Sequence, residues 1–201
     1  MSTSEPIRTT KDGWRRELLG QRRALSTTTL STEAAALLRG VRDLVEQRGT
    51  GTVAAYVPVG PEPGSAQLPQ VLHEAGCAVL LPVVDGRQPL DWARYTGPES
   101  LREARMGLLE PAGERLGQHA IGTADLVLVP ALGVDRRGVR LGRGAGYYDR
   151  SLPSAAAGVE LVAVVRDAEF VEELPGEEHD VRMTAVLTPQ AGFAPLPAAA
   201  R

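Results

Sequence analysis

The sequence has little of several residue types that mark particular classes of protein. Cys77 is its one cysteine, so the chain cannot form an internal disulfide. The first ten residues lack the apolar core of a signal peptide, and no later segment approaches the roughly 18 apolar residues of a membrane span. We therefore expect a protein of the reducing cytoplasm, outside any membrane, in which Cys77 is a small buried hydrophobe.

The sequence also lacks an excess of charge of one sign. Its 22 Lys and Arg residues and 25 Asp and Glu residues are interleaved, and the formal net charge is −3. Proteins that bind nucleic acid or membrane surfaces usually carry a basic face, and no such face with interleaved aromatic residues is visible. A small ligand is the expected partner, and because nothing demands a second subunit we expect a monomer.

Length and composition predict one folded domain. A chain of 201 residues with 43% apolar content can bury a continuous core. Residues 1–10 and 195–201 carry no periodic pattern, so we expect both ends to be loosely ordered. The domain itself is expected at residues 11–194.

The first predicted helix, Lys11 to Leu25, carries two kinds of side chain on neighbouring faces. Its apolar residues fall within about 40° of one another on a helical wheel at 100° per residue. Lys11, Arg15 and Arg22 form a basic strip beside them. A solvated helix face explains three such charges as well as a ligand site does.

The rest of the chain alternates between helical and strand patterns. A second helix is predicted to begin near Ser31, whose hydroxyl is a suitable N-cap, and a third covers residues 68–75. Short β-prone runs, several of them apolar throughout, predict strands at residues 53–57, 77–84, 126–129, 161–165 and 185–187. This alternation predicts an α/β domain with a mainly parallel sheet covered on both sides, and a ligand crevice at the carboxyl ends of its strands.

The most informative stretch follows the third of these strands. It reads as a turn and then a loop in which alternate residues are glycine, at positions 142, 144 and 146. Glycines adopt positive φ and let successive backbone N–H groups approach an oxyanion. A helix beginning at Tyr147 would add its free N–H groups. The spacing matches neither a Walker A loop nor the Rossmann fingerprint.

Charged side chains around this loop decide between two readings. A flexible surface turn needs only Gly, Asn or Pro, whereas Arg140 and Arg143 supply guanidinium groups that bind phosphate. Asp149 could complement the dipole of the predicted helix, or it could hold Mg²⁺ beside a polyphosphate. We interpret the stretch as a phosphate-binding loop.

Residues 140–150 closely resemble the signature of the 5-formyltetrahydrofolate cyclo-ligase family, also called methenyltetrahydrofolate synthetases. The likeness extends from Lys11 to about Thr188. Its further patches, in the family's order, are the basic first helix, Tyr56-Val57-Pro58 followed by Glu62, Leu81-Pro82-Val83-Val84, Leu90-Asp91-Trp92, Glu110-Pro111, Leu128-Val129-Pro130, and Leu174-Pro175 leading to His179-Asp180.

The resemblance implies a three-layer domain akin to the sugar-phosphate isomerase and CoA-transferase-like folds. It also implies that residues 11–194 are catalytic, with ATP as co-substrate and Mg²⁺ as cofactor. The implied reaction is the cyclisation of 5-formyltetrahydrofolate to 5,10-methenyltetrahydrofolate, with release of ADP and phosphate. The two rivals are a non-catalytic ligand-binding relative and an ATP-dependent kinase of another small molecule.

Site residues are carried over from the family onto matching positions. ATP binding is implied for Lys11, Arg15, Arg140, Leu141, Gly142, Arg143, Gly144, Ala145, Gly146, Tyr147 and Tyr148. Folate binding is implied for Arg15, Val57, Glu62, Arg143, Gly144, Ala145, Gly146 and Tyr147. The catalytic residues are expected to be Arg140, Arg143 and Tyr147, and the Mg²⁺ ligands Asp149 and Asp180.

One site residue has a plainer alternative reading, and two positions depart from the family's pattern. By residue type alone, Glu62 would read as an exposed loop acid. Ala145 stands where relatives have lysine or glycine, and Thr184 replaces an acid often present four residues after Asp180. The sequence shows no Cys-His or Ser-His-Asp pairing, so we do not expect a covalent enzyme intermediate.

Overall fold

The computed structural model describes residues 10–104, 107–177 and 180–197. Its centre is a seven-stranded sheet whose five inner strands are parallel, while the strands at its two edges are antiparallel to their neighbours. The predicted mainly parallel sheet is confirmed. In spatial order the strands are β12 (Gly192–Pro195), β11 (Ala185–Thr188), β9 (Glu160–Val164), β6 (Leu126–Pro130), β1 (Thr52–Ala54), β2 (Ala78–Val83) and β3 (Asp91–Tyr95).

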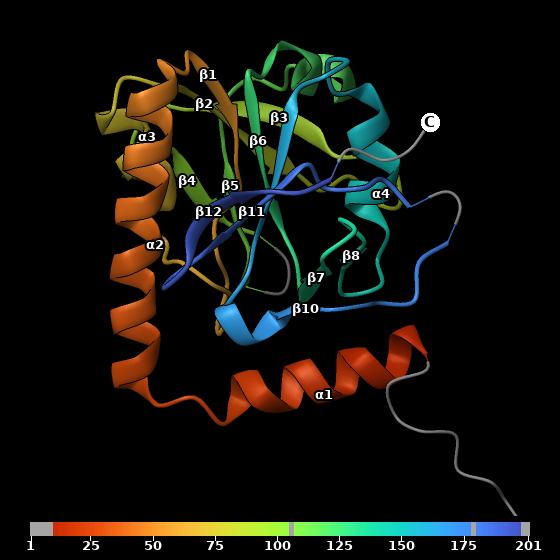
Figure 1. The fold of residues 1–201 in the computed structure, drawn as a ribbon. Helices are drawn as coiled ribbons and strands as arrows, with labels where there is room; N and C mark the ends of the chain where they lie inside the picture. Colours follow the sequence, from red (N-terminus) through yellow and green to blue (C-terminus); the bar gives the residue numbers. More distant parts are fainter. Residues whose placement is uncertain (1–9, 105–106, 178–179, 198–201) are drawn as a thin grey trace, which may run out of the picture.

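Helices and short helical turns cover both faces of this sheet (Figure 1). One face packs against α2 (Thr27–Arg48) and α3 (Leu68–Glu74). Side chains on the other face pack against α4 (Tyr147–Ser151) and the 3₁₀ turns η3 (Gln118–Thr123) and η4 (Leu152–Ser154). Successive residues of the inner strands contribute alternately to the two cores, as the pleat of a strand requires. The predicted three layers are therefore confirmed.

The predicted start of the second helix near Ser31 is wrong. Helix α2 begins at Thr27, because the hydroxyl of Ser26 already accepts a hydrogen bond from the backbone N–H of Thr29 at 3.1 Å. The helix ends at Arg48, and Gly49 follows it as a left-handed C-cap with a φ of 60°, which glycine adopts easily.

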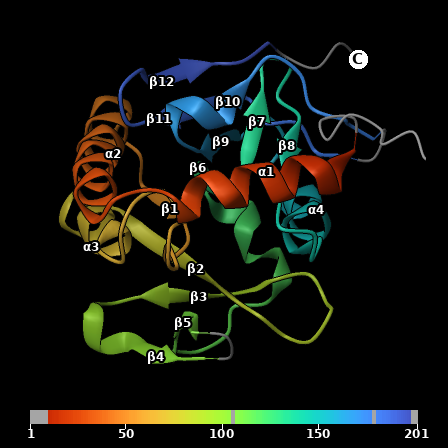
Figure 2. The same cartoon turned by 90° about the horizontal axis from the view of Figure 1, so that it is seen from below.

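Helix α1 (Lys11–Arg23) lies below the main sheet, roughly crosswise to α2 (Figure 1). Seen from below, it crosses β7 (Gly133–Asp135) and β8 (Arg140–Leu141) (Figure 2). These strands form a small sheet with β10 (Phe170–Val171), which follows the turn η5 (Asp167–Glu169). A third core cluster joins α1 to this region through Trp14, Leu18, Leu132, Val139, Leu141 and Leu174.

Two smaller features complete the fold. The hairpin of β4 (Leu101–Glu103) and β5 (Leu109–Pro111) follows the 3₁₀ turn η1 (Pro98–Ser100). At the other end of the chain, β12 extends to Pro195, and the backbone N–H of Leu196 donates to Thr184 at 2.8 Å. The sheet thus continues into the segment that we expected to be loosely ordered. Within the described part of the chain, no helix is long and apolar enough to cross a membrane.

Candidate active site

A cavity of about 800 Å³ opens at the carboxyl ends of β1, β2 and β6. Tyr56 and Val57 follow β1, Pro82 belongs to β2, and Ala131 follows β6. Strand β1 lies where the chain order reverses, since β2 is on one side of it and β6 on the other. The predicted crevice at the strand ends is therefore confirmed. It occupies the switch point that favours ligand binding in open α/β sheets.

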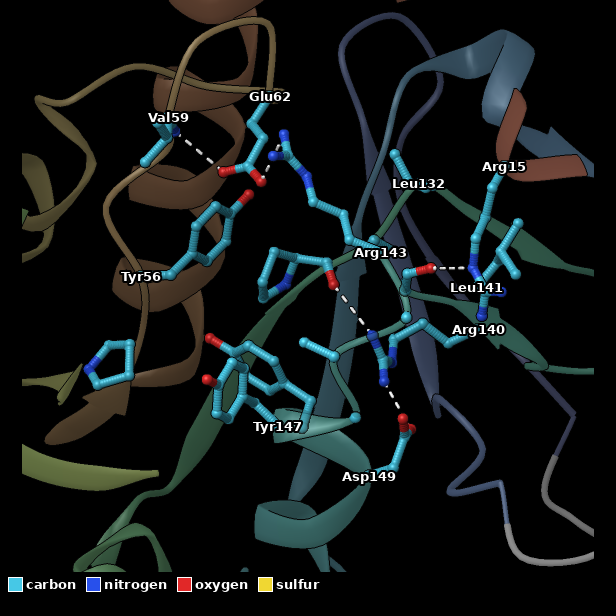
Figure 3. Close-up of a pocket in the computed structure, with 18 of the residues that line it drawn as sticks. Arg15, Tyr56, Val59, Glu62, Leu132, Arg140, Leu141, Arg143, Tyr147 and Asp149 are labelled. Carbon is cyan, nitrogen blue, oxygen red and sulfur yellow. Dashed lines mark hydrogen bonds and ion pairs between the residues drawn. The ribbon is translucent and has the colours of Figure 1, made fainter. Parts of the chain in front are cut away.

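The glycine loop links β8 to α4 and lines this cavity. Gly144 and Gly146 have φ values of 101° and 70°, which side chains with a Cβ rarely adopt. The carbonyl of Gly142 accepts a hydrogen bond from Arg15 Nε of α1 at 3.0 Å (Figure 3). Helix α4 begins at Tyr147, as the sequence predicts.

Arg140 is buried at the base of the loop. Its guanidinium donates to the carbonyl of Pro130 at 3.3 Å and to Asp149 Oδ1 at 2.6 Å (Figure 3). The side chain is 4% exposed, and its Nε has no hydrogen-bond partner among the described residues. A buried donor without a partner is uncommon.

Helix α1 brings two further cations to the cavity. Lys11 Nζ lies 2.9 Å from Asp180 Oδ2 and 3.2 Å from Glu177 Oε2. Burial alone would lower the pKa of Lys11, but its hydrogen bonds and charge interactions with Asp180 and Glu177 outweigh that effect and raise it. Lys11 is therefore charged at neutral pH. Arg15 joins the loop through Gly142, as described above.

Arg22, the third member of the predicted basic strip, points into the protein. Its side chain is 1% exposed and pairs with Glu169 at 2.6 Å. Its Nη2 also donates to the carbonyl of Ala131 at 2.6 Å. We therefore separate Arg22, which holds the fold together, from Lys11 and Arg15.

Glu62 lies on the loop after β1 and faces the glycine loop across the cavity (Figure 3). Its Oε2 accepts from the backbone N–H of Val59 at 2.9 Å, and its Oε1 lies 3.1 Å from Arg143 Nη2. The Glu62 side chain is 14% exposed, whereas Arg143 is 50% exposed. A residue type that usually lies on the surface is thus held at the cavity wall.

Two tyrosine hydroxyls lie near this carboxylate, that of Tyr148, which was expected to bind ATP, and that of Tyr56, for which no site role was expected. The Tyr56 hydroxyl donates to the carbonyl of Pro63 at 3.3 Å, and the buried Tyr148 hydroxyl has no partner among the described residues. Burial raises the pKa of Tyr56 and of Tyr148, and the charge of Glu62 raises both further, so both phenols stay protonated. Tyr147 points its hydroxyl at the carbonyl of Gly86, 2.8 Å away.

Glu110 was also missed as a cavity residue, although it belongs to one of the patches that carry the resemblance. Its Oε1 accepts from the backbone N–H of Val84 at 3.0 Å, at the end of β2. A single acid in the three-residue strand β5 carries no local signal for this position. The place of Glu110 in the cavity wall becomes visible only when the β5 segment is seen beside the end of β2.

All of the expected ATP, folate and metal residues line this one cavity. Asp149 belongs to α4 and Asp180 to the segment that precedes β11, and each is paired with a cation, as given above. Within the described residues, no three His, Cys, Asp or Glu side chains gather closely enough to hold a metal without a ligand. Carboxylate oxygens are donors that Mg²⁺ prefers, and protein Mg²⁺ sites usually take their remaining oxygens from phosphate and water.

The structure also places Cys77 and Thr184. Cys77 is buried, and burial raises its pKa, so the thiol is protonated, as expected of a small hydrophobe. The hydroxyl of Thr184 accepts from the backbone N–H of Leu161 at 2.8 Å, between β11 and β9. His179 lies outside the described residues.

Comparisons with known proteins agree with this geometry. The model of the 5-formyltetrahydrofolate cyclo-ligase family matches residues 7–189. The 5-formyltetrahydrofolate cyclo-ligase of Mycolicibacterium smegmatis is 49% identical over 191 residues, which cover 92% of this chain and 97% of that protein. The Escherichia coli (strain K12) protein of the same name is 31% identical over 141 residues, covering 69% and 78%.

Solved structures give the same result for the fold. The Aquifex aeolicus 5,10-methenyltetrahydrofolate synthetase superposes with a TM-score of 0.78 at 26% identity, covering 95% of both chains. The Mycoplasma pneumoniae 5,10-methenyltetrahydrofolate synthetase, at 18% identity, has a TM-score of 0.71 and covers 89% of this chain and 98% of its own. The chain therefore belongs to the 5-formyltetrahydrofolate cyclo-ligase family.

Proposed function

We propose that this chain catalyses the ATP-dependent cyclisation of 5-formyltetrahydrofolate to 5,10-methenyltetrahydrofolate, with release of ADP and phosphate. One observation carries the proposal. The side chains expected to bind phosphate, among them Lys11, Arg15 and Arg140, share a single cavity with Glu62 and Val57, which are expected to bind folate. A transfer between the two substrates needs this proximity.

In the proposed reaction the formyl oxygen attacks the γ-phosphorus of ATP, and ADP leaves. The N10 nitrogen then attacks the activated formyl carbon, the C–O bond breaks and phosphate departs, and N10 loses its proton. Phosphoryl transfer of this kind depends mainly on alignment and charge neutralisation. Arg140 and Arg143 would neutralise charge on the transferred group, and backbone N–H groups of the glycine loop would align it.

The other proposed roles follow from positions in the cavity. Arg15 would bind phosphate while bracing the loop at Gly142. Tyr147 would lie beside the reacting groups, and Glu62 would accept hydrogen bonds from the pterin. Asp149 and Asp180 would hold Mg²⁺, which supplies charge neutralisation to the phosphates when bound.

We also propose a monomer that works in the cytoplasm, with residues 11–194 as one catalytic domain. The single free thiol, Cys77, is buried and needs no oxidising compartment. Both main core clusters belong to one continuous sheet, which favours a single domain.

The test is a spectroscopic assay of methenyl product formation from 5-formyltetrahydrofolate, with ATP or Mg²⁺ omitted in turn. The expected result is turnover that needs both and releases ADP and phosphate in a one-to-one ratio with product. ADP formation with phosphate retained on a substrate would instead identify a kinase. Ligand binding without turnover would identify a non-catalytic relative.

A further inference from the structure

The backbone on both sides of Glu62 is held by buried side chains. The carbonyl of Pro61, the preceding residue, accepts a hydrogen bond from Arg166 Nη1 at 3.0 Å. The carbonyl of Pro63, the following residue, accepts from the Tyr56 hydroxyl at 3.3 Å. Because these two carbonyls flank Glu62 directly, the position of its carboxylate depends on both anchors.

Arg166 is itself fixed by two carboxylates. Its Nε donates to Glu33 Oε2 of α2 at 2.7 Å, and its backbone N–H donates to Glu169 Oε2 at 2.9 Å. The Arg166 side chain is 6% exposed, so water cannot replace these partners. The planar guanidinium presents donors in fixed directions, which lets it serve Glu33 and the Pro61 carbonyl at the same time.

Glu169 extends this arrangement to α1, because both of its oxygens also accept from Arg22, at 2.6 and 2.8 Å. We call the four side chains Arg22, Glu33, Arg166 and Glu169 the buried ion network. It contains two positive and two negative groups, and it joins α1, α2 and η5 beside the cavity, which Arg22 also lines. Buried ion pairs often stabilise a fold no better than apolar residues of similar volume would.

The structure therefore points to a different role for part of this network. We propose that Arg166 is a positioning residue for folate binding, which acts through the Pro61 carbonyl on Glu62. The proposal rests on the proposed function, in which Glu62 contacts folate. Without Arg166 the Pro61 carbonyl loses its anchor, although the bonds of Tyr56 to Pro63 and of Val59 to Glu62 remain. A displacement of about 1 Å at a binding group can cost up to about 100-fold in rate.

The main test removes Arg166 together with its partner. The paired variant Arg166→Met/Glu33→Met deletes one charge of each sign, so the Arg22 pair with Glu169 stays intact and balanced. We expect the KM for 5-formyltetrahydrofolate to rise about tenfold while the KM for ATP stays within about twofold, because Glu62 lies on the folate side of the site.

The ion pair between Arg48 and Glu160, at the carboxyl end of α2, provides a matched control. Arg48 Nη1 of α2 lies 2.6 Å from Glu160 Oε2 of β9, so this ion pair also joins α2 to the β9 region, at the amino end of that strand. Arg48→Met/Glu160→Met is expected to leave both KM values unchanged. Thermal unfolding of both paired variants separates loss of stability from loss of positioning.

Glu62→Ala, combined with each paired variant, tests whether Arg166 acts on folate binding through Glu62. In the Glu62→Ala background, removal of Arg166 is expected to add no further rise in the folate KM, because the group that it positions is gone. An equal rise with and without Glu62, or equal rises in both KM values, would overturn the proposal. Glu62→Ala with normal folate kinetics would instead contradict the proposed role of Glu62 itself.

Arg166→Lys gives a second test. It keeps the positive charge at this position, so it disturbs the fold less than the paired variant does. Lysine cannot hold two donors in a fixed plane, so we expect the folate KM to rise about threefold with a normal ATP KM. An unchanged folate KM in a folded Arg166→Lys or Arg166→Met/Glu33→Met protein would reject the positioning role, provided that Glu62→Ala raises it.

Discussion

At the scale of single residues, the cavity pairs its cations with its own acids. Lys11 lies beside Asp180, Arg140 beside Asp149, and Arg143 beside Glu62. A phosphate group that approaches one of these cations competes with a carboxylate already in place. Mg²⁺ would relieve this competition at Asp149 and Asp180, because a bound Mg²⁺ would neutralise these carboxylates in place of their arginine and lysine partners.

Asp149→Asn tests this arrangement. We expect turnover to fall by two or more orders of magnitude, because the amide loses the charge that would hold Mg²⁺ and retains only a weak oxygen donor. The measurement is the rate of methenyl formation as Mg²⁺ concentration is raised, together with circular dichroism to confirm the fold. Wild-type rates at ordinary Mg²⁺ would contradict the metal assignment.

Glu74→Gln is the control for this variant. Glu74 also accepts from an arginine, with Arg42 Nη2 3.3 Å away, but it lies on α3 and is 51% exposed. Loss of such a surface pair is expected to change stability by less than about 1 kcal/mol and to leave turnover unchanged. A similar loss of rate in both variants would mean that the Asp149 effect is not specific.

Individual residues also show the limit of sequence analysis. The expected site residues do line one cavity, because the family resemblance that named them covers distant segments that the fold brings together. The burial of Arg22, Arg166 and Glu169 was not foreseen. Arg22 and Glu169 are 147 positions apart, so no local pattern distinguishes them from solvated charges.

At the scale of elements, the turn between β11 and β12 depends on one acid. Asp167 of η5 accepts from the Thr188 hydroxyl at 2.8 Å and from the backbone N–H groups of Gln190 and Ala191 at 3.1 and 2.9 Å. Partial burial raises the pKa of Asp167, but these hydrogen bonds together outweigh it and lower the pKa below its ordinary 3.8.

Asp167→Asn is expected to lose about 1 kcal/mol of unfolding free energy near neutral pH, because the charge-assisted bonds weaken. A lowered folded-state pKa gives stability that is present above the unfolded value and is lost as pH falls through the folded value. The difference from wild type should therefore shrink below the ordinary pKa of 3.8. Urea unfolding across this range measures it, and a difference that grows on acidification would contradict the assignment.

Strands within apolar runs were predicted well, and strands outside such runs were not. The five inner strands follow apolar runs that could only be buried on both faces. The antiparallel edge strands β3 and β12 were missed, as were β7, β8 and β10, which have two or three residues each. Such short strands carry no periodicity, and tertiary pairing decides them.

At the scale of the whole molecule, the cavity has two walls that meet only in the folded state. One wall is α1, and the other consists of the strand ends with the glycine loop. Among the described residues, α1 contributes to the third core cluster and to neither of the two sheet cores. Its attachment therefore depends on a small apolar contact and on the polar contacts of Lys11, Arg15 and Arg22.

Binding of ATP with Mg²⁺ is expected to tighten this attachment. At a ligand concentration of 100 Kd, a ligand that binds only the closed form stabilises it by about 2.7 kcal/mol, which slows amide exchange in α1 by up to about 100-fold. Hydrogen exchange measured by mass spectrometry checks this, with α3 as the internal reference. A rise in Tm without added protection of α1 would contradict a nucleotide site shared between the two walls.

The thin attachment of α1 suggests a way to divide the protein. Residues 24–26 alone connect α1 to α2, so a chain that begins at Ser26 would keep both sheet cores while it lost Lys11 and Arg15. The apolar side chains that pack against α1 would then be free to bind a synthetic peptide carrying this helix; they are Leu132, Val139, Leu141 and Leu174. If such a peptide restored turnover when added in trans, the rate of methenyl formation would report binding between two separate molecules.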